Sequence, residues 1–414
     1  MYMKCELSNA YAFNQGDQVL YLLVDVVADT PCLENERRTP LNLSILIDRS
    51  GSMSGTKLDH AKKAAAEVVR LLEVGDYVSV IGFDNSVRVH VPAQRVDADS
   101  RPEILDRVRK IACGGGTDIH RALQSGFDQL QVVAGPGVIS RIILLSDGQD
   151  ESGNTLESLS SQASELAASQ MALTSLGIGD DFDEEMLIAI AERSGGASHY
   201  IKDASDIIDI FRQELSRLYC IVARWPRLLV RVSRNVRIVR VLNENYRSRV
   251  VDDTAEIQLG DMSVGDRHAV LMQLVVVPWP AGEFRIAQVE LNYQTSGSSV
   301  PERLDDDVLV TYTDRPELVR DGRNLDVLRR REELNVATVL TRTMIELKKG
   351  KIKTEQAAEE IDNAHATLVR YGTSPLTEEL SKTILEVARD GKQPGTIKGA
   401  TYLATNIRSP RRER

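Results

Sequence analysis

The chain has 414 residues, of which 42% are hydrophobic and 27% are charged, and its formal net charge at pH 7 is −10. This length allows two or three domains with cores of their own, and the acidic balance argues against attraction of the whole chain to nucleic acid or anionic lipid. The four cysteines lie far apart with no Cys-x-x-Cys pair, which predicts free thiols in a reducing compartment rather than a disulfide framework or a zinc site.

The first segment, residues 1–38, is predicted to form short β-strands. Residues 1–16 lack the basic start and apolar run of a secretory signal. The apolar stretch at 19–28 is interrupted by Asp25 and is too short to cross a bilayer. We therefore expect a cytoplasmic protein that does not enter a membrane.

Residues 39–221 alternate strands with helices, which predicts an α/β domain with a doubly wound, mainly parallel sheet. The continuous apolar run at 41–47 is typical of a strand covered on both faces. Tight-turn residues between the strands at 77–83 and 87–91 predict a hairpin to an antiparallel edge strand. The other predicted strands are 141–145, 173–178 and 199–201. The predicted helices are 58–72, 102–111, 119–132, 156–170, 184–193 and 205–218.

Oxygen-bearing side chains stand where two of these strands end. Asp48, Ser50 and Ser52 follow the first strand of the domain, and Asp147 lies just beyond a later apolar strand. Thr117 comes directly after three consecutive glycines. Because ligands of such sheets bind at the carboxyl ends of strands near a topological switch point, we expect these side chains to meet there. Hydroxyl and carboxylate oxygens suit a hard divalent cation, so the sequence predicts a metal site.

The order Asp-x-Ser-x-Ser, then a distant threonine, then a distant aspartate resembles the metal-ion-dependent adhesion site of von Willebrand factor type A domains. A lone Asp-x-Ser-x-Ser more often forms a turn or caps a helix, but here all five positions match, and the resemblance covers residues 39–221. The resemblance implies that these five residues hold Mg²⁺, with Mn²⁺ or Ca²⁺ as alternatives. It also implies that an Asp or Glu of another protein completes the coordination of the ion.

Four further residues near this edge have more than one interpretation. Arg49 is either a contact to the partner or half of an exposed salt bridge. Asp84 and Asp150 either support the ion from a second layer or are solvated loop residues, and Asp118 is expected to cap the helix that follows it rather than touch the ion. The glycines at 114–116 are expected to adopt positive φ and so to carry Thr117 to the ion.

After residue 221 the pattern changes to short β-type runs with turn residues between them, which predicts an antiparallel sheet with one solvated face. The predicted strands are 227–232, 236–242, 254–259, 268–277 and 285–293. We predict that residues 222–313 join residues 1–38 in one β-sandwich, into which the α/β domain is inserted. The inter-alpha-trypsin inhibitor heavy chains and the Ro ribonucleoprotein resemble this arrangement, because β-strands flank their A domains.

The last part of the chain is predicted to be helical. Residues 314–391 show helical patterns at 325–347, 354–371 and 376–388, which predict a small helical bundle. Residues 392–414 are predicted to form a flexible basic tail.

No catalytic pattern stands out in the sequence. The run after Gly51 lacks the Gly-Lys-Ser/Thr of a phosphate loop, Ser50 stands where a haloacid-dehalogenase-type site needs a second acid, and there is no Gly-x-Ser-x-Gly. We therefore predict a non-enzymatic, metal-dependent binding module or scaffold. Two alternatives remain: an adaptor of a MoxR- or chelatase-type AAA+ ATPase, and a Ro-like nucleic-acid-associated protein. The second would use the arginine-rich stretch at 224–249, where aromatic side chains for base stacking are scarce.

Overall fold

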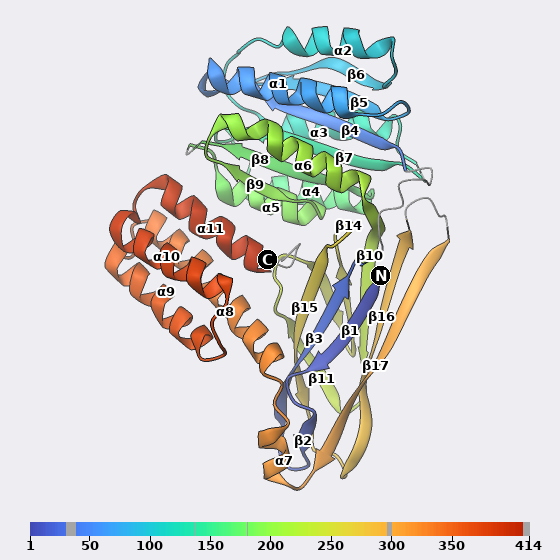
Figure 1. Ribbon diagram of the computed structural model, residues 1–414, viewed down its shortest axis with the longest axis vertical. Coiled ribbons are helices and arrows are strands. Elements are labelled where there is room, and N and C mark those ends of the chain that lie inside the picture. The colour runs from blue at the N-terminus through green and yellow to red at the C-terminus, as the bar shows by residue number, and fades with distance from the viewer. Residues whose placement is uncertain (30–38, 136, 180, 296–299, 409–414) are drawn as a thin grey trace. The chain divides into compact units, whose positions relative to one another are not determined.

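A computed structural model of the chain describes residues 1–29, 39–135, 137–179, 181–295 and 300–408 (Figure 1). The chain divides into two compact units. One is Cys32–Val222, and the other combines Met1–Pro31, Ala223–Thr295 and Val300–Arg414. The first unit is therefore an insertion in the second, because the chain leaves the second unit after its first strands and returns to it later.

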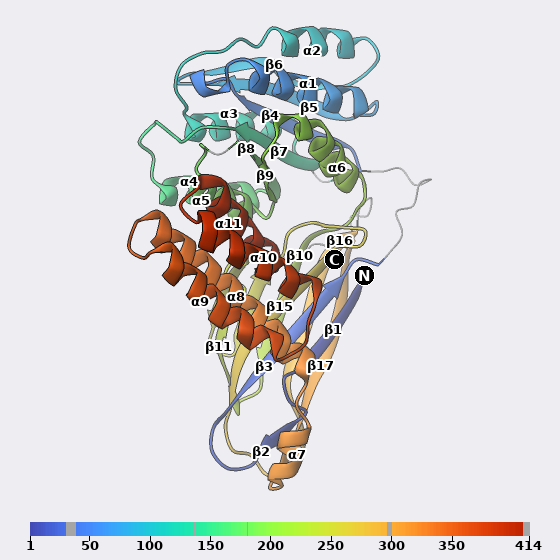
Figure 2. The ribbon, with the colours of Figure 1, turned by 60° about the vertical axis from the view of Figure 1, so that its left-hand side comes forward.

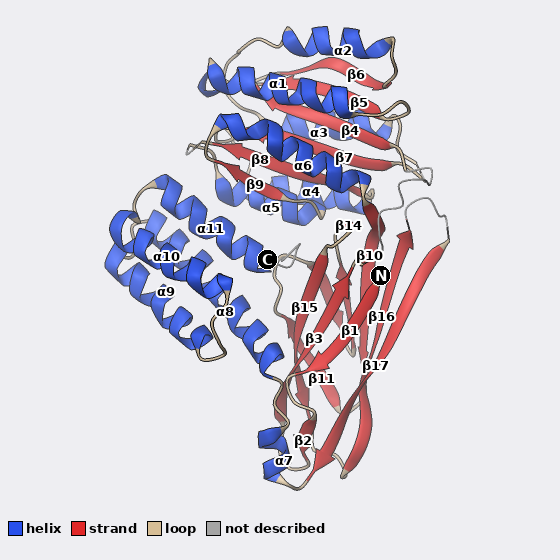
Figure 3. Ribbon diagram, viewed as in Figure 1, coloured by secondary structure: helices blue, strands red, loops and turns tan. Residues whose placement is uncertain are grey.

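The inserted unit is an α/β domain built on a six-stranded sheet with the order β6-β5-β4-β7-β8-β9 (Figure 3). Its strands are β4 (Leu41–Asp48), β5 (Tyr77–Phe83), β6 (Val87–Arg95), β7 (Ile139–Ser146), β8 (Met171–Ile178) and β9 (Ser198–Ile201). Neighbouring strands are parallel except for β5 and β6, which form the predicted antiparallel edge hairpin. The prediction of a doubly wound, mainly parallel sheet is confirmed.

Helices cover both faces of this sheet. They are η1 (Gly51–Met53), α1 (Thr56–Leu71), α2 (Ser100–Arg109), α3 (Ile119–Gln131), α4 (Leu156–Ala168), α5 (Glu184–Ser194), η2 (Ala204–Asp206) and α6 (Ile207–Tyr219). Every residue of β4 and β7 is buried, as expected for strands covered on both sides. Ile45 and Ile47 face a core that includes Leu58 of α1 and Phe211 of α6. Because β4 connects to β5 on one side and β7 connects to β8 on the other, the topological switch point lies between β4 and β7.

The second unit contains two β-sheets. One has the order β1-β3-β15-β11, and the other has the order β12-β13-β10-β16-β17-β2, with β14 paired to β10. The strands before the insertion are β1 (Tyr2–Leu7), β2 (Tyr11–Phe13) and β3 (Gln18–Val27). Those after it are β10 (Ile221–Val232), β11 (Val236–Val241), β12 (Arg247–Val251), β13 (Thr254–Gln258), β14 (Met262–Ser263), β15 (Arg267–Val276), β16 (Gly282–Thr295) and β17 (Pro301–Thr313). Since β3 pairs with β15 along its whole length, the two flanks do share a sheet, as predicted.

This unit differs from the predicted sandwich in two respects. β2 pairs with β17 in parallel, so the second sheet is not purely antiparallel. The strands β12, β14 and β17 were not predicted. In β17 the run Asp305–Asp307 hides the alternating pattern, which becomes clear only with the buried Val308, Val310 and Tyr312.

The helices of the second unit are α7 (Pro316–Asp321), α8 (Leu325–Lys348), α9 (Thr354–Val369), α10 (Pro375–Asp390) and α11 (Pro394–Arg408). The prediction of a flexible tail at 392–414 is wrong for residues 394–408. These residues form α11, which runs alongside the other helices of this unit (Figure 2). The helix forms because Ile397, Leu403 and Ile407 pack into the core shared by α8, α9 and α10. Residues 409–414 lie outside the described part of the chain.

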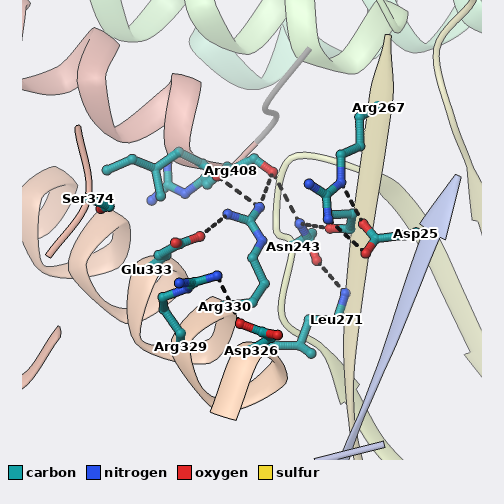
Figure 4. A network of polar contacts seen from close by, with 12 residues as sticks. Asp25, Asn243, Arg267, Leu271, Asp326, Arg329, Arg330, Glu333, Ser374 and Arg408 are labelled. Atoms are coloured by element: carbon teal, nitrogen blue, oxygen red, sulfur yellow. Dashed lines mark hydrogen bonds and ion pairs between the residues drawn. The ribbon is translucent and has the colours of Figure 1, made fainter. Parts of the chain in front are cut away.

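Arg330 and Asn243 hold the carboxyl end of α11 against α8 and the sandwich (Figure 4). The buried guanidinium of Arg330 donates hydrogen bonds to the carbonyl oxygens of Ile407 at 2.9 Å and Arg408 at 3.3 Å. The Asn243 amide donates to the same Arg408 oxygen at 3.1 Å and accepts the backbone N–H of Leu271 at 2.8 Å. The last carbonyl groups of a helix have no hydrogen-bond donor within the helix, so Arg330 and Asn243 supply the donors that a further turn would have provided.

Arg330→Met should therefore destabilise the second unit by about 1–3 kcal/mol, because it leaves buried carbonyl groups without their charged donor. Arg329→Met is the matched control, since Arg329 is adjacent on α8 and its guanidinium forms an ion pair with the exposed Asp326. Thermal unfolding followed by circular dichroism should show a lower midpoint for the first variant alone. Equal midpoints in the two variants would show that the Arg330 contacts do not hold α11.

Candidate metal centre

The proposed ligand residues meet at the carboxyl edge of the α/β sheet, between β4 and β7. Asp48 is the last residue of β4, and Asp147 directly follows β7. The two strands are neighbours, with Ile47 opposite Leu145. Both carboxylates are fully buried, so the fold places two acidic groups side by side at its topological switch point.

The two serines link these carboxylates. The Ser52 hydroxyl donates a hydrogen bond to Oδ1 of Asp147 at 2.7 Å and lies 3.0 Å from the Ser50 hydroxyl. The backbone N–H of Ser50 donates to Oδ1 of Asp48 at 2.8 Å. The turn after β4 is thus tied to both acids, and its two hydroxyl groups lie between them.

Gly148 shows how closely the three segments converge. A Cβ atom added to Gly148 would lie 3.2 Å from Thr117 Oγ1, 3.7 Å from Asp48 Oδ2 and 3.7 Å from Ser52 Oγ. Oxygens of three proposed ligands therefore surround one point beside Gly148, two of them from the end of β4 and the turn after it and the third from Thr117. A donor set of hydroxyl groups with few carboxylates suits Mg²⁺, which retains several waters when bound to protein. Among the described residues, no group of three or more His, Cys, Asp or Glu side chains is placed so that it could hold a metal ion. The candidate site instead combines two carboxylates with three hydroxyl groups.

Gly148→Ala should weaken binding of Mg²⁺ by about ten- to a hundredfold, because the added methyl group would intrude among these oxygens. The fold should tolerate it, since the nearest atoms belong to side chains. Gly135→Ala is the control, because a Cβ there would meet nothing within 4 Å. Calorimetric titration of both variants with Mg²⁺ checks the prediction. If Gly148→Ala bound Mg²⁺ with the affinity of the wild type, the proposed ligand oxygens would not meet beside Gly148.

The glycines at 114–116 have a different role from the one predicted. None of the three adopts positive φ, so that prediction is wrong. Instead, a Cβ on Gly114 would overlap the Asp84 carboxylate, and a Cβ on Gly116 would overlap the Glu151 carboxylate. Glycine is required most clearly at Gly114, because the buried Asp84 carboxylate, held by hydrogen bonds from Ser86, fills the space beside it. The backbone of the glycine segment is tied to the serine turn, since the N–H of Gly51 donates to the Gly115 carbonyl at 2.8 Å.

Arg49 and Asp84 form an ion pair beneath this glycine segment. Arg49 Nη2 lies 2.8 Å from Asp84 Oδ2, so Arg49 does form a salt bridge, one of its two predicted roles. Only 15% and 9% of the two side chains are exposed, so this salt bridge is largely buried rather than exposed. Burial opposes the ionisation of Asp84, but hydrogen bonds from Ser86 and Gly115 and the charge of Arg49 outweigh it, and the pKa of this carboxyl is lowered. Asp84 thus supports the glycine segment as an anion.

Asp118 and Asp150 both serve the first turn of α3. Asp118 caps the helix, as predicted, because its carboxylate accepts the N–H of Arg121 at 3.0 Å. Asp150 accepts the N–H of Ile119 at 2.9 Å. The first N–H groups of a helix have no partner within it, so these two carboxylates fix the helix that directly follows Thr117.

Two residues that the sequence analysis did not single out touch the central carboxylates. Ser146, the last residue of β7, donates to Oδ2 of Asp48 at 2.6 Å. Lys57, near the start of α1, makes an ion pair with Oδ2 of Asp147. Burial raises the pKa of Asp48, and the negative charge of Asp147 raises it further. Hydrogen bonds from Ser146 and Ser50 lower this pKa, but they offset the effect of burial only in part. Ser146 could have been recognised from the sequence as a candidate site residue, because it stands beside Asp147 at a strand end. Nothing in the sequence indicates that Lys57 contacts Asp147.

Comparison with known proteins agrees with this fold. The family model of the von Willebrand factor type A domain matches residues 42–213 of this chain. An uncharacterized protein of Synechocystis sp. is 29% identical over 291 residues, which are 67% of this chain and 67% of that protein. Inter-alpha-trypsin inhibitor heavy chain H2 of Mus musculus is 29% identical over 195 residues, which are 44% of this chain and 20% of that protein. The chain thus spans about a fifth of the heavy chain.

Solved structures share the fold over nearly the whole chain. A von Willebrand factor type A protein from Catenulispora acidiphila has a TM-score of 0.78 at 18% identity, covering 100% of this chain and 97% of its own. The ArnB paralog VWA2 from Sulfolobus acidocaldarius has a TM-score of 0.64 at 18% identity, covering 97% of both chains. Residues 42–213 of this chain are therefore a von Willebrand factor type A domain, a module commonly used in protein–protein interaction.

The arginine-rich stretch at 224–249 lies on β-strands of the second unit. Arg227 pairs with Glu256 on β13 at 2.7 Å, and Arg231 pairs with Glu290 on β16 at 3.2 Å. Such cross-strand pairs are typical of a solvated strand face. Among the described helices, none is long and apolar enough to cross a bilayer.

Proposed function

We propose that the chain is a non-enzymatic binding protein whose von Willebrand factor type A domain grips an Asp or Glu of a partner protein through a divalent cation. The cation is Mg²⁺, with Mn²⁺ or Ca²⁺ as alternatives. Its ligands are Asp48, Ser50, Ser52, Thr117 and Asp147. The observation that carries this proposal is the convergence of oxygens of Asp48, Ser52 and Thr117 on the space beside Gly148, the residue that follows Asp147.

Each group in the site has a defined task. The hydroxyl groups of Ser50, Ser52 and Thr117 would bind the ion directly, and Asp48 and Asp147 would bind it directly or through water. Both carboxylates are fully buried. Hydrogen bonds from Ser50 and Ser146 hold Asp48, and a hydrogen bond from Ser52 holds Asp147. Because Mg²⁺ takes six oxygen ligands and the protein supplies few, a position remains for the partner's carboxylate. The bound ion would supply the positive charge that attracts this carboxylate.

Affinity capture from a cell extract, with the whole chain as bait, tests this function. In buffer with Mg²⁺ the wild type should retain a partner that EDTA releases. Thr117→Val, which replaces the hydroxyl with a methyl group of similar size, should not retain it. Ser54→Ala should behave as the wild type, because Ser54 is an exposed residue at the end of the same turn as Ser52. Partners that are held equally by Thr117→Val, or in EDTA, would contradict metal-dependent binding.

An AAA+ ATPase of the MoxR or chelatase type is one class of partner within this proposal. Copurification of an ATPase whose rate changes when Asp147 is replaced would identify it. The ion-paired Arg227 and Arg231 support a protein partner over a nucleic acid. The thiols of Cys5 and Cys113 are free, which supports the cytoplasm as the proposed location.

A further inference from the structure

Lys57 is a cation that the chain itself places in the proposed metal site. Its ammonium group makes an ion pair with Oδ2 of Asp147, whose Oδ1 accepts the Ser52 hydroxyl at 2.7 Å. Asp147 is fully buried, and 29% of the Lys57 side chain is exposed. Both oxygens of this proposed ligand are therefore engaged already, and one of them faces a positive charge.

Lys57 stands in the first turn of α1, where the electrostatics of the helix disfavour a positively charged side chain. Lys57 is the second residue of α1, and the first turn of a helix carries a partial positive charge that disfavours lysine. The end of its side chain also packs beside Gly179, where an added Cβ would lie 3.7 Å from Nζ and 3.8 Å from Cε. The contact with Asp147 offsets the unfavourable helix position. Lys63, by contrast, is exposed on the same helix.

We propose that Lys57 is a tethered cation that competes with the divalent ion for Asp147 and thereby lowers the affinity of the site for the ion. The competition rests on the proposed function, since it presupposes a divalent ion at Asp147. An ion that enters beside Ser52 must either share the Asp147 carboxylate with the ammonium group or displace it. Sharing brings like charges together, and displacement breaks a buried ion pair, so both routes weaken binding.

Lys57→Met separates this effect from simple packing. Methionine keeps an unbranched side chain beside Gly179 but removes the charge. Affinity for Mg²⁺ should then rise by about tenfold or more, because repulsion of a divalent ion by a nearby unit charge in a half-buried site is lost. Lys57→Arg keeps the charge and should show no such rise.

Calorimetric titration of the whole chain with MgCl₂, and then with MnCl₂, measures this directly. The protein is first stripped with EDTA, which is removed before titration, and circular dichroism checks that each variant is folded. Lys63→Met is the matched control, because it removes the same net charge from the exposed side of α1. Asp48→Ala provides the baseline for a site without one of its acids.

The outcomes distinguish the competition from the proposed function. Tighter binding in Lys57→Met alone supports the competition, as does binding that appears only in that variant. Saturable binding with the same affinity in wild type and Lys57→Met, or weaker binding in the variant, overturns the competition and leaves the metal site standing. No saturable binding in either protein overturns the metal site, and the competition with it.

Discussion

Asp48→Ala should abolish saturable binding of Mg²⁺, with a loss of affinity of at least about a hundredfold. Asp48 is one of only two carboxylates in the site, and it organises the rest. Its Oδ1 accepts the N–H of Ser50, which fixes the serine turn, and its Oδ2 accepts the hydroxyl of Ser146. Removal of the side chain takes away a charge and the anchor of the turn together. Asp59→Ala is the control, because Asp59 is exposed on α1.

Asp48→Asn separates the loss of the metal site from a loss of folding. Burial and the charge of Asp147 both disfavour the ionised form of Asp48, so an uncharged side chain of the same shape should leave the unfolding midpoint in EDTA unchanged or raise it. Mg²⁺ should raise the midpoint of the wild type and have no effect on the variant, since a ligand stabilises only the state that binds it. Calorimetry and thermal unfolding check this pair, and equal heats in wild type and variants would contradict the assignment.

Gly196→Ala should destabilise the type A domain by about 4 kcal/mol or more, because the added Cβ has no space. The turn between α5 and β9 packs directly on the backbone of β8. A Cβ on Gly196 would overlap the carbonyl oxygen of Leu173 and lie 2.6 Å from its carbonyl carbon. These are backbone atoms of a paired strand, so no side-chain rotation can relieve the overlap. The variant should be poorly soluble or should unfold at a much lower temperature.

Gly135→Ala is the control for this substitution too, because it adds the same methyl group in open space of the same domain. Urea unfolding of the two variants compares them directly. A Gly196→Ala protein with the stability of the control would show that the turn does not lie against β8 in solution.

The arrangement of the type A domain could be predicted because its sequence pattern is local and strong. The apolar runs that become β4 and β7 mark strands buried on both faces, and strand ends in parallel sheets share an edge. Asp48 and Asp147 could therefore be placed side by side without knowing any distance between them. The cap at Asp118 followed from its place before a helix.

Individual side-chain contacts between remote segments could not be predicted. The ion pair of Lys57 with Asp147 and the overlap of Gly114 with Asp84 exist only once the segments are brought together. Residues 392–414 were predicted to be a flexible tail because the end of the chain is basic. That prediction overlooked Ile397, Leu403 and Ile407, which pack into the core of the helical bundle and so form α11. In such cases tertiary contacts, and not local pattern, decide the structure.

Crystals of the whole chain grown with Mn²⁺ would test the metal site most directly, by the anomalous scattering of the ion. The proposed function predicts one strong anomalous peak in the type A domain, bordered by the side-chain oxygens of Ser50, Ser52 and Thr117, with Asp48 and Asp147 behind it. Density that lacks this peak at saturating Mn²⁺, or that shows the ion only at other surface carboxylates, would contradict it.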